Sequence, residues 1–120
     1  DPSKLLDKVE QYPDINFQLA HLGDGIPEII KAVNDLDNLY LDTAMSNHEA
    51  YRYMYKNNGT TTEDIITSQP EGKVLFCSDE PWGNLQEQLQ NIVKLQEDGT
   101  FSTKDVDRVL YKNAAHLWDF

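Results

Sequence analysis

The fold is decided by residues 74–82, VLFCSDEPW. The first four of these residues form an unbroken apolar run, which is typical of a strand buried on both faces of a parallel sheet. The run ends at a polar turn that contains Asp79 and Pro81. We therefore predict a buried strand over residues 74–77, with a carboxylate emerging directly beyond it.

Two further strands are predicted upstream of this one. The first covers residues 15–20 and ends at His21, and the second covers residues 39–41 and ends at Asp42. Between them, residues 26–33 place apolar side chains at the spacing of one helix face. The three strands are therefore separated by segments long enough to hold helices.

Helices are predicted before, between and after the strands. Strands separated in this way are parallel, because the crossover returns the chain to the same edge of the sheet. The predicted fold class is therefore α/β, built from parallel βα units. The remaining helical segments are residues 1–11, residues 47–56, a turn at residues 63–68, a helix with Leu85, Leu89, Ile92 and Val93 on its core face that stops at residues 97–99, and a last helix that begins at a capping box of Ser102 and Asp105.

Parallel sheets bind ligands at the carboxyl ends of their strands, and that edge would carry His21, Asp42 and Asp79 together. His21 could ligate a metal or transfer protons near neutral pH, or it could simply bond to a loop carbonyl. Asp79 could be partnered by a metal or a cationic group, or it could cap the helix that follows near Gly83. Asp42 is interpreted as a turn-forming or supporting residue.

Composition narrows the class of protein and its partners. The 120 residues fit one domain, 39% are hydrophobic, and no stretch is apolar enough to span a membrane. The net charge of -11 argues against nucleic acid and against an anionic membrane surface as partners. The single Cys77 excludes an internal disulfide and fits a cytoplasmic location. His48 and His116 are interpreted as structural.

Four segments in order resemble the amidohydrolase-related, metal-dependent hydrolases of TIM-barrel fold, the group that includes aminocarboxymuconate-semialdehyde decarboxylase. They are residues 17–23 (FQLAHLG), 39–44 (LYLDTA), 74–81 (VLFCSDEP) and 106–117 (VDRVLYKNAAHL). The first three are similar to the sixth, seventh and eighth strands of the family's (β/α)₈ barrel, and the last is similar to its closing helix. The resemblance thus identifies residues 1–120 as a single C-terminal partial barrel domain.

The resemblance also implies roles for two residues. Asp79 corresponds to the eighth-strand aspartate, which binds the catalytic divalent metal, zinc in our interpretation, and handles the proton of the attacking water. His21 corresponds to the sixth-strand histidine, which acts on water or substrate and sometimes ligates the metal. The family's first-strand His-x-His pair and fifth-strand histidine have no counterpart here, and Cys77 replaces the family's usual glycine.

We therefore expect a metal-dependent hydrolase of which this chain is one part. The complete enzyme would hydrolyse, or decarboxylate without oxidation, a small carboxylated or cyclic substrate. The chain opens with Asp1-Pro2 rather than Met, and we expect it to begin inside a longer protein, to be inactive and poor in zinc alone, and to self-associate or pair with the missing barrel half. The alternatives are a non-catalytic interaction module derived from such a barrel and a small doubly wound, receiver-like domain.

Overall fold

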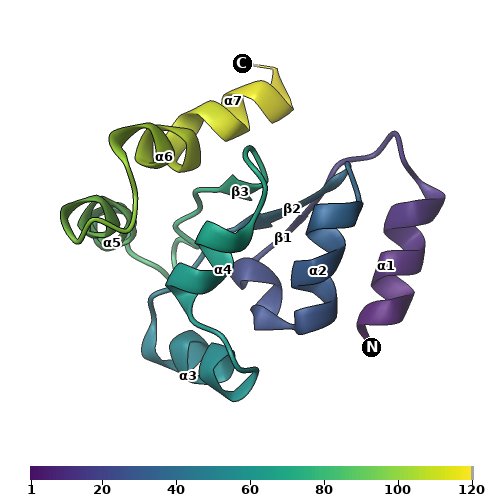
Figure 1. Ribbon diagram of the computed structural model, residues 1–120, viewed down its shortest axis with the longest axis horizontal. Helices are drawn as coiled ribbons and strands as arrows, with labels where there is room; N and C mark the ends of the chain where they lie inside the picture. The colour runs from purple at the N-terminus through teal and green to yellow at the C-terminus, as the bar shows by residue number, and fades with distance from the viewer. Residues whose placement is uncertain (120) are drawn as a thin grey trace.

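The structure is a computed structural model that describes residues 1–119. It is an α/β molecule in which one parallel sheet is surrounded by helices (Figure 1). The elements follow in the order α1 (Pro2–Gln11), β1 (Phe17–Leu19), η1 (His21–Gly25), α2 (Pro27–Asp35), β2 (Leu39–Asp42), α3 (Glu49–Asn57), α4 (Thr62–Ser68), β3 (Val74–Leu75), α5 (Leu85–Glu97), α6 (Thr103–Asp107), η2 (Arg108–Lys112) and α7 (Asn113–Trp118).

The three strands lie side by side in the order β1-β2-β3, and both pairings are parallel. Phe17 is opposite Leu39, and Leu41 is opposite Val74. This confirms the predicted parallel βα units. The order contains no reversal within residues 1–119, so this part of the chain lacks the switch point at which doubly wound sheets bind ligands. The described sheet therefore does not favour the receiver-like alternative.

Most of the predicted helices are present with small changes of boundary. Asp1 caps α1 by accepting a hydrogen bond from the Ser3 N–H at 3.0 Å, with Pro2 in the first turn. The capping box of Ser102 and Asp105 opens α6 as predicted. The predicted helix over residues 47–56 begins later, because His48 is its N-cap and accepts from the Ala50 N–H at 3.2 Å. His48 is thus structural, as interpreted.

Two of the predicted strands are longer than those in the structure, whereas β2 extends one residue beyond its predicted range, to Asp42. Residues 15–20 yield only β1, and the predicted strand over residues 74–77 yields only β3. Beyond Leu75 the chain leaves the sheet, and the Phe76 N–H, on the outer side of β3, donates to the carbonyl of Val109 at 2.9 Å. The backbone of Cys77 then donates to the Thr43 hydroxyl at 3.2 Å. A long apolar run therefore did not guarantee a long strand.

The outer edge of β3 is covered by the C-terminal helices. The carbonyls of Lys73 and Leu75 accept hydrogen bonds from the N–H groups of Leu41 and Thr43. The Val74 carbonyl between them therefore points the other way, where Asn113 Nδ2 donates to it at 2.8 Å. Val109 is available to Phe76 because η2 is a π-helical turn, in which the Asn113 N–H bonds to the Arg108 carbonyl. A helix thus replaces a fourth strand at this edge.

The predicted core face of α5 is partly wrong. Leu85 is 44% exposed and Val93 is 39% exposed, whereas Gln88, Ile92 and Leu95 are buried. The helix is therefore rotated relative to the prediction, and a glutamine takes a place expected for an apolar side chain. Since α5 packs mainly against α6, its contact face is set by that neighbour rather than by its most apolar stripe.

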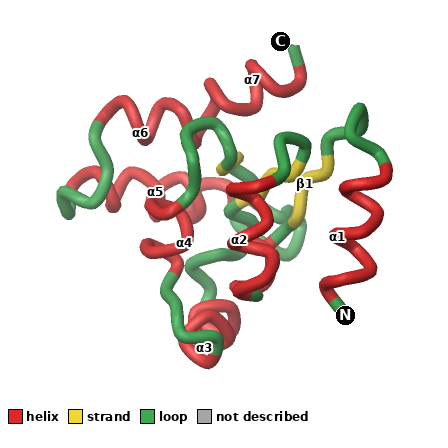
Figure 2. The backbone as a smooth tube through the Cα atoms, turned by 45° about the vertical axis from the view of Figure 1, so that its right-hand side comes forward, coloured by secondary structure: helices red, strands yellow, loops and turns green. Residues whose placement is uncertain are grey.

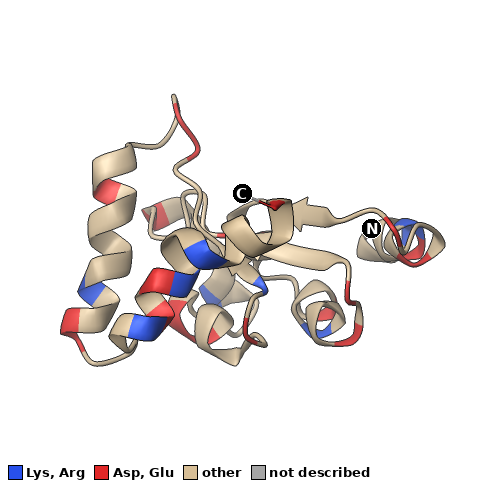
Figure 3. Ribbon diagram, turned by 90° about the horizontal axis from the view of Figure 1, so that it is seen from above, with Lys and Arg blue, Asp and Glu red and all other residues tan. Residues whose placement is uncertain are grey.

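Figure 2 shows α3 and the α6–α7 segment at opposite ends of the molecule, with the strands between them. Within residues 1–119 the longest helix, α5, has 13 residues, and no helix is both long and apolar enough to cross a bilayer. Acidic residues occur on helices and loops in many parts of the described chain, as Figure 3 shows.

Candidate active site at the carboxyl ends of the strands

His21 is the first residue of an unusual left-handed turn directly beyond β1. Residues 21–25 all have positive φ, between 51° and 67°. Gly23 and Gly25 adopt this conformation easily, but His21, Leu22 and Asp24 each lose about 1 kcal/mol in it. Leu22 is fully buried, so its packing offsets part of this cost. The left-handed path of this turn determines the direction in which His21 leaves the strand.

Three contacts hold His21 in place. Its ring Nδ1 lies 2.9 Å from the Ala44 carbonyl oxygen, and its own carbonyl accepts from the Tyr55 hydroxyl at 2.8 Å. Its ring stacks on Tyr51, with centroids 4.3 Å apart and planes 24° apart. A carbonyl oxygen can only accept, so Nδ1 carries a proton and the neutral ring keeps its lone pair on Nε2. The loop-carbonyl bond considered for His21 is therefore present, and it leaves Nε2 available.

Asp42 is a buried, fully bonded aspartate. One carboxylate oxygen accepts from the Ala44 N–H at 3.0 Å, and the other accepts from Gln18 Nε2 at 2.8 Å. The first of these bonds closes a tight turn over residues 42–44, which confirms the interpretation of Asp42 as turn-forming. This turn also positions the Ala44 carbonyl that binds His21. Asp42 therefore supports the site and has no oxygen left free of protein donors.

Asp79 lies half-buried in a turn that follows β3. Its φ is 61°, and its carbonyl accepts from the Gly83 N–H at 2.7 Å. No group within residues 1–119 donates a hydrogen bond to its carboxylate. The N-cap of α5 is Asn84, which accepts from the Glu87 N–H at 2.9 Å, and Glu80 accepts from the Leu85 N–H at 3.1 Å. The structure therefore contradicts the helix-cap alternative for Asp79.

The shifted pKa values of two neighbours link His21 to Asp79. Burial raises the pKa of the Tyr51 hydroxyl, and the negative charges of Asp24 and Asp79 raise it further. Burial also raises the pKa of the Cys77 thiol, with smaller contributions in the same direction from Asp42 and Asp79. Tyr51 thus touches His21 and lies within electrostatic reach of Asp79. The protonated Cys77 thiol is a poor nucleophile and a poor metal ligand.

These residues offer few ligands to a metal ion. Among the carboxyl-edge residues, Nε2 of His21 and the carboxylate oxygens of Asp79 have no hydrogen-bond partner within residues 1–119. Both are donors that zinc accepts, but catalytic zinc sites use three protein ligands. Within residues 1–119, no three His, Cys, Asp or Glu side chains are grouped so that they could hold a metal. The two donor types therefore fit a zinc ion, but the described residues supply at least one ligand fewer than a catalytic zinc site uses.

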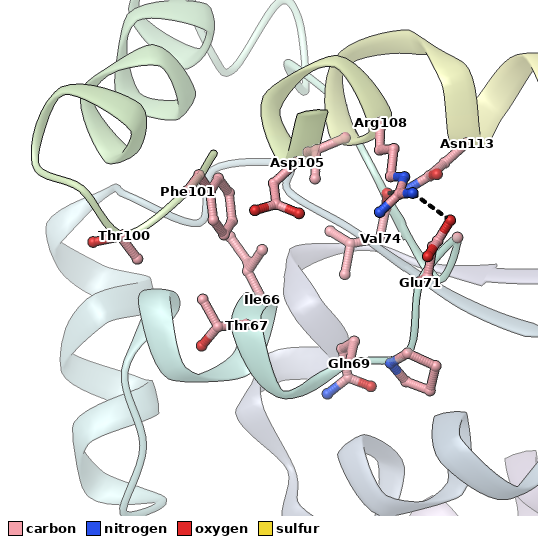
Figure 4. A pocket seen from close by; sticks show the side chains of 13 residues that line it. Ile66, Thr67, Gln69, Glu71, Val74, Thr100, Phe101, Asp105, Arg108 and Asn113 are labelled. Carbon is pink, nitrogen blue, oxygen red and sulfur yellow. Dashed lines mark hydrogen bonds and ion pairs between the residues drawn. The ribbon is translucent and has the colours of Figure 1, made fainter. Parts of the chain in front are cut away.

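A hollow lies directly beside the Asp79 turn. It has a volume of about 290 Å³, and its wall includes Gly83 as well as His48, Trp82 and Gln88. Trp82 is 82% exposed, so its indole is accessible to a ligand. A second cavity, also of about 290 Å³, lies at the other end of β3, where Arg108 forms an ion pair with Glu71 (Figure 4). None of the predicted site residues lines that second cavity.

Sequence reasoning missed the residues that hold His21. Tyr51 and Tyr55 are four residues apart, so they share one face of α3. That aromatic spacing was a usable signal, but it did not reveal which residue the face would meet. Ala44 contributes a backbone carbonyl, which leaves no trace in the sequence. His116 is exposed on α7, far along the chain from the strands that carry the site.

Comparison with known proteins supplies one match. A sequence model for a family described as Amidohydrolase matches residues 1–120. No curated protein and no solved structure matches the chain.

Proposed function

The chain belongs to the amidohydrolase family, and from that premise we propose that it carries two reactive groups of a metal-dependent hydrolase, Asp79 and His21. The observation that carries the proposal is the contrast between three carboxyl-edge residues. Asp42 has both oxygens bonded within the protein, whereas within residues 1–119 Asp79 has no donor to its carboxylate and His21 keeps Nε2 free. Unpaired polar groups beside a sheet's carboxyl edge favour a ligand that completes them.

Asp79 and His21 would together hold a divalent metal, with zinc the best match to a carboxylate and an imidazole. When bound, such an ion supplies Lewis acidity, which lowers the pKa of water toward neutrality. The carboxylate of Asp79 would accept the proton of the attacking water, and it has both oxygens available for this. His21 Nε2 would hold the ion or receive a proton, while the Ala44 carbonyl keeps the other ring nitrogen protonated.

The missing ligands lead to a second part of the proposal. In our proposal, β1, β2 and β3 correspond to the sixth, seventh and eighth strands of a barrel, and further ligands come from earlier strands. Residues 78–81 and residues 113–115 resemble the corresponding segments of the group that includes aminocarboxymuconate-semialdehyde decarboxylase. The hollow beside Gly83 would admit a small carboxylated or cyclic substrate, with the exposed Trp82 as its apolar wall.

The test of catalysis is Asp79→Asn in the complete enzyme, measured as hydrolysis of a panel of cyclic amides and small carboxylated amides. We expect a loss of turnover of at least about 100-fold, because an amide cannot accept the proton. The fold should survive, because Asn is isosteric and tolerates the left-handed φ of 61°. Glu80→Gln, one residue away, is the control, since a Gln oxygen still accepts from Leu85. Activity within a few-fold of wild type in Asp79→Asn would refute the assignment.

The metal is tested on the chain of 120 residues itself. After dialysis against a mild chelator, we expect well under one zinc per chain, because two ligands hold the ion weakly. Residual zinc affinity, measured by titration calorimetry, should fall in His21→Asn and Asp79→Asn but not in Glu80→Gln. A full zinc per chain after dialysis would mean that additional ligands are present in this chain.

A further inference from the structure

We propose that Tyr51 is a positioning residue for His21, whose ring fixes the imidazole so that Nδ1 stays on the Ala44 carbonyl and Nε2 stays free. The inference rests on the proposed function for the use made of Nε2. The geometry of the three groups is independent of that use. The imidazole is bound at its edge by a carbonyl, with 2.9 Å between nitrogen and oxygen, and on its face by a phenol ring, with 4.3 Å between centroids.

The hydrogen bond to Ala44 is not enough to fix the ring. A carbonyl oxygen accepts hydrogen bonds over a broad range of directions, so an imidazole on one such bond can still tilt. A histidine without further contacts also exchanges its proton between Nδ1 and Nε2. The stacked Tyr51 ring removes the tilt, because the two planes are only 24° from parallel. The edge contact and the face contact together define one ring orientation and one tautomer.

Tyr51 itself is placed by the helix that carries it. Tyr55 lies one turn further along α3, is fully buried, and donates its hydroxyl hydrogen to the His21 carbonyl at 2.8 Å. Its ring packs on Gly25, where an added Cβ would come within 2.6 Å of Tyr55 Cδ1. The helix is therefore anchored to the turn that carries His21, and Tyr51 is held opposite the imidazole at a fixed distance.

The ring of Tyr51, rather than its hydroxyl, carries this role. No hydrogen bond to or from the hydroxyl is found within residues 1–119. Burial, together with the charges of Asp24 and Asp79, raises the pKa of the hydroxyl, so the phenol is neutral at physiological pH. An aromatic ring without the hydroxyl group would stack on the imidazole equally well. We therefore expect Phe to replace Tyr51 and an aliphatic side chain to fail.

The experiment is nitrogen-15 NMR of the histidine rings in the metal-free chain, with His21 assigned by its loss in His21→Asn. In the wild type we expect one His21 tautomer, protonated at Nδ1, and ring protons shifted upfield by the stacked phenol. Tyr51→Phe should keep both signatures. Tyr51→Leu should lose the upfield shift and move the two nitrogen signals toward the average of a freely exchanging histidine. Tyr53→Leu is the matched control, since Tyr53 is on the same helix but 68% exposed.

A single Nδ1-protonated tautomer that persists unchanged in Tyr51→Leu would overturn the proposal, and so would its loss in Tyr51→Phe. If Tyr51→Leu does not fold, the test is made on the wild-type chain. Cross-relaxation between the Tyr51 and His21 ring protons is expected there, and its absence would refute the stacked contact and with it the proposal. These readouts need neither metal nor turnover. Retained activity in Asp79→Asn would therefore refute the proposed function while leaving the result for Tyr51 intact.

Discussion

At the scale of single residues, Gly83 sets the position of Asp79. A Cβ added to Gly83 would lie 1.8 Å from the Ser78 carbonyl oxygen, and that oxygen belongs to the backbone, so it cannot swing aside. The Gly83 N–H also closes the turn onto the Asp79 carbonyl. The absence of a side chain at this position therefore keeps the loop after β3 compact.

We expect Gly83→Ala to lower the free energy of unfolding by about 3 kcal/mol, because the overlap forces the backbone to move. Gly59→Ala is the matched control. Its φ of 80° is left-handed, but nothing lies within 4 Å of the added Cβ, so only conformational strain of about 1 kcal/mol is expected. Urea unfolding of both variants measures the difference. Equal losses would show that the turn relaxes easily.

The position of the two proposed site residues beyond their strands was predictable from the sequence, and their surroundings were not. His21 and Asp79 each follow an apolar run, and that pattern is visible in any parallel α/β chain. The left-handed turn was missed because three of its five residues are not glycine, and such residues rarely adopt positive φ. Tyr51 was missed because its partner is 30 positions away, and side-chain spacing on one helix does not identify a distant neighbour.

At the scale of elements, the capping box at the start of α6 makes stability depend on pH. Hydrogen bonds from the Ser102 N–H and hydroxyl lower the pKa of Asp105 below its ordinary value of 3.8. The folded state therefore favours the ionised carboxylate. This stabilisation is fully present above pH 3.8 and is lost as the pH falls through the lower pKa of the folded state.

Asp105→Asn should remove that dependence, since its side chain no longer titrates. Comparing the thermal midpoints of wild type and variant between pH 2 and pH 6 should give two curves that converge at the acidic end. Their separation should be largest above pH 4, where the wild type is ionised. Parallel curves over the whole range would contradict a role for this carboxylate.

The helical cover of β3 is a second feature at this scale. Asn113 is 9% exposed, and its Nδ2 donates to the Val74 carbonyl. Asn113→Asp removes the donor and places a charge beside a buried carbonyl, so we expect a loss of about 2 kcal/mol or more in unfolding free energy. Asn34→Asp is the control, because Asn34 Nδ2 makes the same kind of bond, to the Ile30 carbonyl, at the surface. A similar loss in both would contradict the importance of the buried contact.

Why the element boundaries differed from the prediction follows from contacts of this kind. Hydrophobic pattern identified three strands and their order, because alternating apolar runs and helices determine which segments can pair. It could not show that Phe76 would bond to Val109, which lies 33 positions further along the chain. The prediction of the contact face of α5 was wrong for the same reason, since Gln88 is buried by its neighbours although its own side chain is polar.

At the scale of the whole molecule, the two edges of the sheet differ. The edge of β3 is covered by η2 and α7, whereas β1 has no partner strand on its outer side within residues 1–119. We therefore place the expected self-association, or pairing with further barrel strands, at β1. An exposed strand edge favours pairing, while a net charge of -11 opposes the approach of identical copies.

Sedimentation at two ionic strengths tests this expectation. Salt screens the repulsion between copies, with a Debye length of about 10 Å at 0.1 M and about 3 Å at 1 M. We expect the weight-average mass to rise with protein concentration, and to rise more steeply at 1 M salt. A single monomeric species at every concentration and at both ionic strengths would contradict the assignment of an association edge.

The π-helical turn at residues 108–112 also has a consequence for chain length. Such a turn contains one residue more than the α-helix it interrupts. Deleting one residue there, for example the exposed Tyr111, would restore the regular ladder, and the Val109 carbonyl would then bond within its own helix. Phe76 would lose its acceptor, and Asn113 would turn away from Val74 by roughly a quarter of a revolution. The number of residues in this helical segment is therefore constrained by the contacts it makes with Val74 and Phe76. Insertions or deletions in related chains should avoid residues 108–112.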